Sequence, residues 1–167
     1  MSLSAALVGL AAVLWFGAGI MLGVADYRTR LLPKRLIWPT AAAVWALYSL
    51  SSLAQGQAAG LIGAAVGAGA CGAILAGIHF AHPPSMGFGD VRLSLLNGLV
   101  CGWWGWQAAL LGLMAGFVLA LPEAVVVLVR HGPRASRPLG PYLVAGTAAT
   151  LIWLIATRGL APLRTPI

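Results

Sequence analysis

Two aspartates are the side chains of this sequence best suited to acid–base chemistry. The chain has only three acidic residues, and two of them, Asp26 and Asp90, each lie where an apolar run meets a polar or basic segment. Carboxylates are costly in apolar surroundings and normally face a cavity or a partner, so they indicate a functional site. Two carboxylates that share a site cannot both ionise readily, and such a pair can act as base and acid on one water. This is the chemistry of aspartic proteolysis.

The residues before Asp90 favour the same interpretation. In Gly87-Phe88-Gly89-Asp90, two glycines precede the carboxylate. Because glycine has no side chain, backbone or substrate can approach Asp90 closely. Two plainer interpretations stay open: Asp90 could cap the helix that follows it, and Asp26 could pair with Arg28 or Arg30.

The other titratable residues give weaker signals. Glu123 lies seven residues before Arg130, about 10 Å into the membrane at the helical rise, and a packing role is favoured. His79 and His82 share a helix face and could bind metal together with the aspartates, but two histidines without a third fixed ligand are a weak pattern. We therefore expect neither a metal nor another cofactor.

The composition predicts that membrane helices must position these residues. Hydrophobic residues make up 60% of the chain and charged residues 8%, and the mean hydropathy is +0.94, whereas a soluble domain has roughly 25% charged residues. A chain of 167 residues can supply about six spans of roughly 20 residues each. We expect an all-α integral membrane protein with one domain over residues 1–167. The net charge of +7 suits loops that face anionic lipid, so the bilayer is an expected partner and nucleic acid is not.

The uncharged runs predict where the helices lie. We expect six spans: 3–25, two within 36–78 divided by a polar break at 51–57, a short one at about 89–102, 107–129, and about 139–157. Eight of the ten basic residues then fall on one side, which the positive-inside rule makes cytoplasmic, with both termini outside. Asp26 ends the first span and Asp90 begins the fourth on that same side. The two carboxylates can therefore meet.

Small and aromatic residues add expectations about packing. The third span has small residues at every fourth position from Gly56 to Ala76, which favours close packing inside the chain, with homodimerisation as the alternative. Trp103, Trp104 and Trp106 are typical of an aromatic belt at the outer interface. The two cysteines, Cys71 and Cys101, lie in apolar sequence, and we expect them to pack as small hydrophobes.

Three motifs resemble those of the type IV prepilin peptidases. They are Asp26-Tyr27-Arg28-Thr29-Arg30-Leu31-Leu32-Pro33-Lys34, Gly87-Phe88-Gly89-Asp90-Val91-Arg92-Leu93, and Arg137-Pro138-Leu139-Gly140-Pro141-Tyr142-Leu143. The resemblance implies a GxGD-type membrane aspartic endopeptidase with Asp26 and Asp90 in the catalytic positions. Its implied substrate is a prepilin-like protein, whose short basic leader and N-terminal apolar helix it would meet at the cytoplasmic face of the cell membrane.

The resemblance also implies supporting residues and some differences. Gly87, Gly89, Pro33, Lys34 and Arg92 are expected to shape the site or to contact the substrate. Lys34 stands where the family usually has Asn, and Arg92 where it usually has Lys, but neither change removes a carboxylate. Longer members carry an N-terminal cytoplasmic segment with paired Cys motifs, associated with N-methylation, and we expect none here, as in the short peptidase-only members.

Two other classes of function compete with the peptidase. A non-enzymatic ion or metal carrier could use the Asp pair with His79 and His82, although a transporter usually shows repeats and paired broken helices. A pilus-assembly scaffold could have the same fold without activity. The presence of both aspartates argues against an inactive scaffold.

Overall fold

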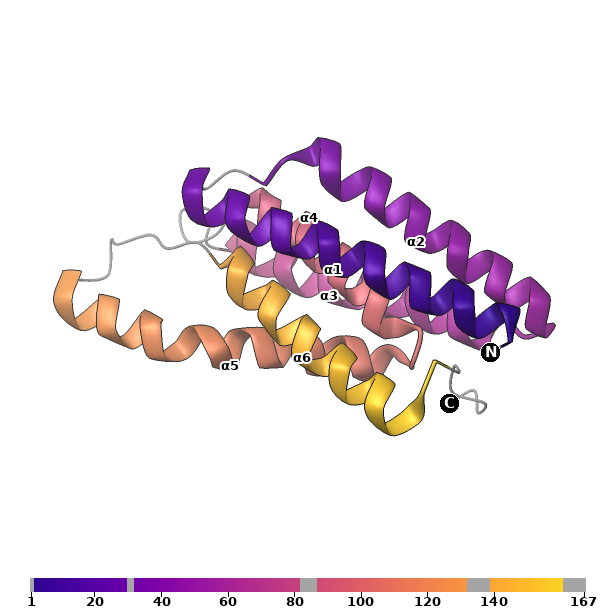
Figure 1. Cartoon of the computed structure of the whole chain (residues 1–167). Helices are drawn as coiled ribbons and strands as arrows, with labels where there is room; N and C mark the ends of the chain where they lie inside the picture. The colour runs from indigo at the N-terminus through magenta and orange to yellow at the C-terminus, as the bar shows by residue number, and fades with distance from the viewer. Residues whose placement is uncertain (1, 30–31, 82–86, 132–138, 161–167) are drawn as a thin grey trace.

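The computed structural model describes residues 2–29, 32–81, 87–131 and 139–160 of the chain, and these residues form α-helices and no strand (Figure 1). The helices are α1 Leu3–Thr29, α2 Lys34–Gln55, α3 Ala59–Ala81, α4 Phe88–Gly102, α5 Trp106–His131 and α6 Gly140–Arg158. Five of them, all except α4, are long and apolar enough to cross a membrane. The all-α prediction is confirmed, and a helix lies at each of the six predicted positions, although α4 is too short to count as a span by itself.

Successive helices run in opposite directions along the bundle. The ends of α1, α3 and α5 and the starts of α2, α4 and α6 lie toward the left of Figure 1, and both chain termini lie toward the right. Asp26, near the end of α1, and Asp90, near the start of α4, therefore lie toward the same end. The side of the membrane that this end faces stays a prediction.

The short helix α4 is the centre of the bundle. It packs against each of the other five helices, and eleven of its fifteen residues are buried. At 1.5 Å per residue it is about 22 Å long, which is shorter than a hydrocarbon core of about 30 Å. Because neighbours surround α4 on all sides, polar residues on it are shielded from lipid.

Glycines on α3 and α4 let these two helices approach closely. A Cβ atom added to Gly102 of α4 would lie 2.5 Å from the carbonyl oxygen of Gly63, and one added to Gly98 would overlap the carbonyl oxygen of Gly67. The small residues of α3 are therefore used for packing inside the chain, as predicted. Homodimerisation stays a prediction, although α4 covers this face of α3.

The prediction of an aromatic belt was wrong for Trp103 and Trp104. Each is only 1% exposed. The Trp103 ring packs on Tyr48, with 4.5 Å between ring centroids, and Trp104 donates its Nε1–H to the carbonyl oxygen of Gly159 at 2.9 Å. These indoles follow a helix that ends inside the bundle, so neighbouring helices enclose them.

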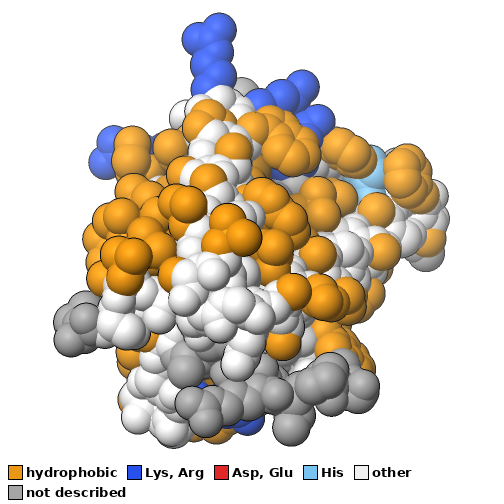
Figure 2. Space-filling model, turned by 90° about the vertical axis from the view of Figure 1, so that its right-hand side faces the viewer, with side chains coloured by type: hydrophobic (Ala, Val, Ile, Leu, Met, Phe, Trp, Pro, Cys, Tyr) orange, Lys and Arg blue, Asp and Glu red, His pale blue; other side chains and the backbone are white. Residues whose placement is uncertain are grey.

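The remaining packing agrees with a lipid-embedded protein. Cys71 and Cys101 are buried free thiols, as expected. Figure 2 shows hydrophobic side chains over much of the face in view. Exposed apolar surface of this extent is unusual for a soluble monomer and is normal for helices in contact with lipid.

Candidate active site

Asp26 lies on the buried stripe of α1. Trp15, Gly19, Leu22 and Asp26 are buried positions spaced three or four residues apart, so they face the same side of the helix. The apolar run ends at Ala25, but the helix continues to Thr29 and keeps Asp26 in this stripe. The side chain is 5% exposed. Asp26 thus continues the buried stripe of α1, and the preceding positions of that stripe are apolar residues or glycine.

Asp90 lies in the first turn of α4 and is 8% exposed. The N-cap residue of α4 is Gly87 and not Asp90, but the plainer interpretation, in which Asp90 stabilises the start of this helix, stays open. Asp90 is the third helical residue, and its carboxylate hydrogen-bonds the backbone of Gly87. A side chain at this position commonly reaches back to the N-cap in this way. Asp90 therefore supports the start of α4 while lying inside the bundle.

The two carboxylates lie close enough to interact electrostatically. One comes from the last turns of α1 and the other from the first turn of α4. Neighbouring buried carboxylates repel each other when both are ionised. That the pair shares one proton, and so provides one base and one acid, stays a prediction.

The three motifs noted in the sequence converge on this pair. The backbone N–H of Gly140, at the start of α6, donates to Oδ2 of Asp26 at 3.0 Å. Leu32, from the connection after α1, packs over Gly89, because a Cβ atom on Gly89 would lie 3.0 Å from Cβ of Leu32. The first motif thus touches the third through Asp26 and the second through Leu32.

The other predicted site residues lie around this centre. Pro33 is the N-cap of α2 and Lys34 is its first residue, and both side chains are exposed. The guanidinium carbon of Arg92 lies 4.7 Å from the ring centroid of Phe88, so Arg92 stacks on its own helix. Gly87 has an extended backbone, with φ −72° and ψ 144°, which any residue can adopt.

Among the described residues, no group of three or more His, Cys, Asp or Glu could hold a metal ion. The ring of His79 packs against the rings of Phe80 and Phe88. Its predicted partner, His82, lies outside the described residues, as does Arg30. Glu123 is half-buried in α5.

A buried asparagine links the three helices that carry the site. Asn97 of α4 accepts a hydrogen bond from Nε1 of Trp15 on α1 at 3.1 Å, and its amide donates to the carbonyl oxygen of Leu143 on α6 at 3.3 Å. Asn97 lies two helical turns beyond Asp90 on a similar face. Sequence reasoning missed it, although a lone Asn in an apolar run is a usable signal of buried polar contacts.

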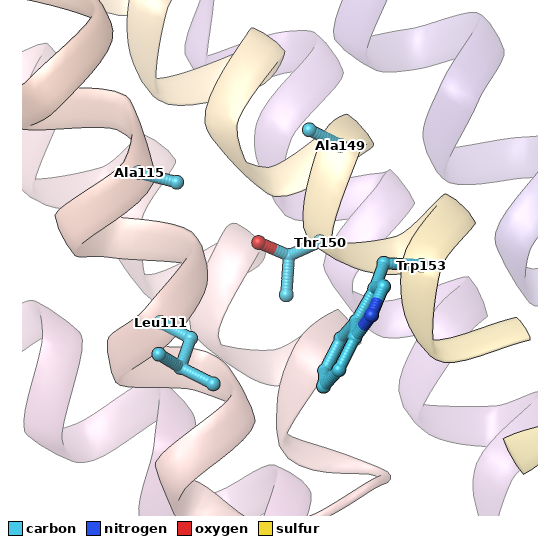
Figure 3. A pocket seen from close by; sticks show the side chains of 5 residues that line it. All are labelled: Leu111, Ala115, Ala149, Thr150 and Trp153. Atoms are coloured by element: carbon cyan, nitrogen blue, oxygen red, sulfur yellow. The ribbon is translucent and has the colours of Figure 1, made fainter. Parts of the chain in front are cut away.

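A groove opens between α1 and α6 near the end of α1 that carries Asp26. It has a volume of about 530 Å³, and its lining includes Gly23, Val24, Tyr27 and Pro141. A second groove, of about 380 Å³, lies between α5 and α6 and is lined by Leu111, Ala115, Ala149, Thr150 and Trp153 (Figure 3). Its α6 residues are about 13 to 20 Å from Gly140 at the helical rise. The first groove is therefore the one nearer to the aspartates, although its lining includes neither Asp26 nor Asp90.

Comparison with known proteins agrees with this geometry. Residues 12–125 match the type IV leader peptidase family, a range that includes both aspartates. The chain is 28% identical over 149 residues to the prepilin leader peptidase/N-methyltransferase of Escherichia coli (strain K12), which covers 84% of this chain and 62% of that protein. The chain thus aligns with less than two thirds of that relative's length. No solved structure matches. By the family match over most of its length, the chain belongs to the type IV leader peptidase family.

Proposed function

We propose that this protein is a membrane-embedded aspartic endopeptidase of the GxGD type that removes the leader from prepilin-like proteins at the cytoplasmic face of the cell membrane. The observation that carries the proposal is the pair of buried carboxylates, Asp26 and Asp90, which lie within electrostatic reach of each other. Family membership and the relationship to a prepilin leader peptidase support the same activity and substrate class.

The proposed reaction needs only the two aspartates and one water. The ionised aspartate takes a proton from the water, and the resulting hydroxide attacks the carbon of the scissile peptide carbonyl. The protonated aspartate donates a hydrogen bond to the carbonyl oxygen and stabilises the charge that develops there. The tetrahedral intermediate then collapses as the C–N bond breaks, and the aspartate that took the proton from the water gives it to the leaving nitrogen, which releases the leader.

The position of the pair suits a substrate that is itself held in the membrane. The groove between α1 and α6 runs along the outer surface of the bundle, and its lining includes Tyr27 and Arg28, the two residues after Asp26. An apolar segment in the bilayer can therefore approach without leaving the lipid. The basic residues near the same end of the bundle, such as Arg28 and Lys34, support a cytoplasmic position for the cut.

Cleavage of a prepilin-like protein by the purified enzyme tests the proposal. The substrate carries a short basic leader before an apolar helix. The E. coli relative serves as the positive control, which shows that the substrate can be cleaved. We expect one cut at the end of the leader, seen as a mass decrease and a single new N-terminus. The matched negative control is Asp26→Asn, after gel filtration has shown that this variant is folded.

Failure can be recognised without ambiguity. If folded wild-type protein leaves intact a substrate that the relative converts, the proposed function is wrong. If cleavage occurs but is abolished by a chelator and restored by one divalent metal, a metal site replaces the proposed acid–base pair.

A further inference from the structure

We propose that Gly140 is a positioning residue for Asp26 and that its lack of a side chain is what allows the carboxylate to sit where the reaction needs it. This inference rests on the proposed function, because it concerns how one aspartate of the pair is held. The two residues are 114 positions apart in sequence and meet at the start of α6.

The contact leaves no room for a Cβ atom at position 140. Such an atom would lie 2.5 Å from Oδ2 of Asp26, 2.9 Å from its Cγ and 3.2 Å from its Cβ. The three nearest atoms all belong to the Asp26 side chain. A substitution at Gly140 must therefore shift either that carboxylate or the start of α6, and either shift changes how Oδ2 of Asp26 is held.

The same contact supplies charge stabilisation that α1 cannot provide. Asp26 lies in the last turn of α1, where the helix dipole presents its negative end. Gly140 is the first residue of α6, so its N–H belongs to the positive end of another helix. The hydrogen bond of 3.0 Å thus both orients Oδ2 and compensates the unfavourable end of α1.

The test substitutes Gly140→Ala and separates catalysis from folding. We expect kcat for leader removal to fall at least about tenfold, because small displacements of reacting groups cost about one to two orders of magnitude. We expect KM to change less than about twofold, because Gly140 contacts the aspartate and not the substrate. A merely structural role would lower the amount of active enzyme in proportion to the loss of folded protein.

Two other glycines provide matched controls. A Cβ atom on Gly17 of α1 would meet nothing within 4 Å, so Gly17→Ala is expected to keep both kcat and melting temperature. A Cβ atom on Gly146 of α6 would overlap the backbone of Gly116, so Gly146→Ala is expected to lower the melting temperature. The kcat of its folded fraction is expected to stay near the wild-type value.

A wild-type kcat in folded Gly140→Ala contradicts the inference and leaves the proposed function intact, whereas inactivity of the wild type contradicts the proposed function itself. If Gly140→Ala does not yield folded protein, the second variant combines it with Asp26→Ala, which removes Oδ2 and Cγ, the two atoms nearest to the added methyl group, and leaves only Cβ at 3.2 Å. Recovery of folded protein supports the contact. Failure to recover it shows that position 140 is needed for packing independent of Asp26, and overturns the inference.

Discussion

Asp26 and Asp90 owe their places to different local rules. Asp26 follows Leu22 by four residues on the buried stripe of α1, so the helical repeat turns it inward. Asp90 is held in the first turn of α4 by its bond to Gly87. The sequence predicted that both would lie at one end of the bundle. It could not predict the bond from Gly140, because contacts across 114 residues leave no local pattern.

A prediction at this scale concerns His79 and the metal alternative. An aspartic pair holds its water without an ion, whereas a metal site would lose most of its affinity with one ligand gone. His79→Ala is therefore expected to change the cleavage rate by less than about fivefold, through loss of its packing on Phe88. A rate assay with and without chelator checks this. A loss of two or more orders of magnitude in His79→Ala would favour a ligand role.

At the scale of elements, α4 determines how the bundle is built. The sequence predicted a short fourth span, and the helix Phe88–Gly102 agrees. It did not predict that α4 is central, because an apolar run can face lipid or protein equally well. The same ambiguity explains the error at Trp103 and Trp104, whose position after a span suggested an interface but whose indoles are enclosed.

The contact between α3 and α4 gives a stability prediction. Gly98→Ala would press a methyl group against the carbonyl oxygen of Gly67. We therefore expect overpacking to lower the free energy of unfolding by about 1–3 kcal/mol. The measurement is the melting temperature of the purified protein in detergent. Gly69→Ala, on α3 with nothing within 4 Å of the added atom, is the control and should melt like the wild type. Equal melting of all three proteins would contradict the close contact.

At the scale of the whole molecule, basic residues distinguish the two ends of the bundle. Among the described residues, one end carries Arg28, Lys34, Arg35, Arg92 and Arg130, and the opposite end carries Arg158. The sequence predicted this asymmetry because charge follows directly from residue type and helix order. The orientation in the bilayer still rests on the positive-inside rule.

Cysteine labelling tests that orientation. Lys34→Cys and Gln57→Cys place exposed thiols at opposite ends of α2, in a background where the buried Cys71 and Cys101 are replaced by alanine. A membrane-impermeant maleimide applied to intact cells should label position 57 and not position 34. After the cells are opened, both positions should react. The reverse pattern in intact cells would place the aspartates at the outer face.

The central claim is that Asp26 and Asp90 form one catalytic unit, and the most direct measurement is the cleavage rate of Asp26→Asn, Asp90→Asn and the double variant beside the wild type. Residues that act as a unit have non-additive effects, because removing either one already removes the mechanism. We predict that each folded single variant falls to the same residual rate and that the double variant falls no further. A single variant that keeps the wild-type rate, or two partial losses that multiply in the double variant, would contradict a shared site.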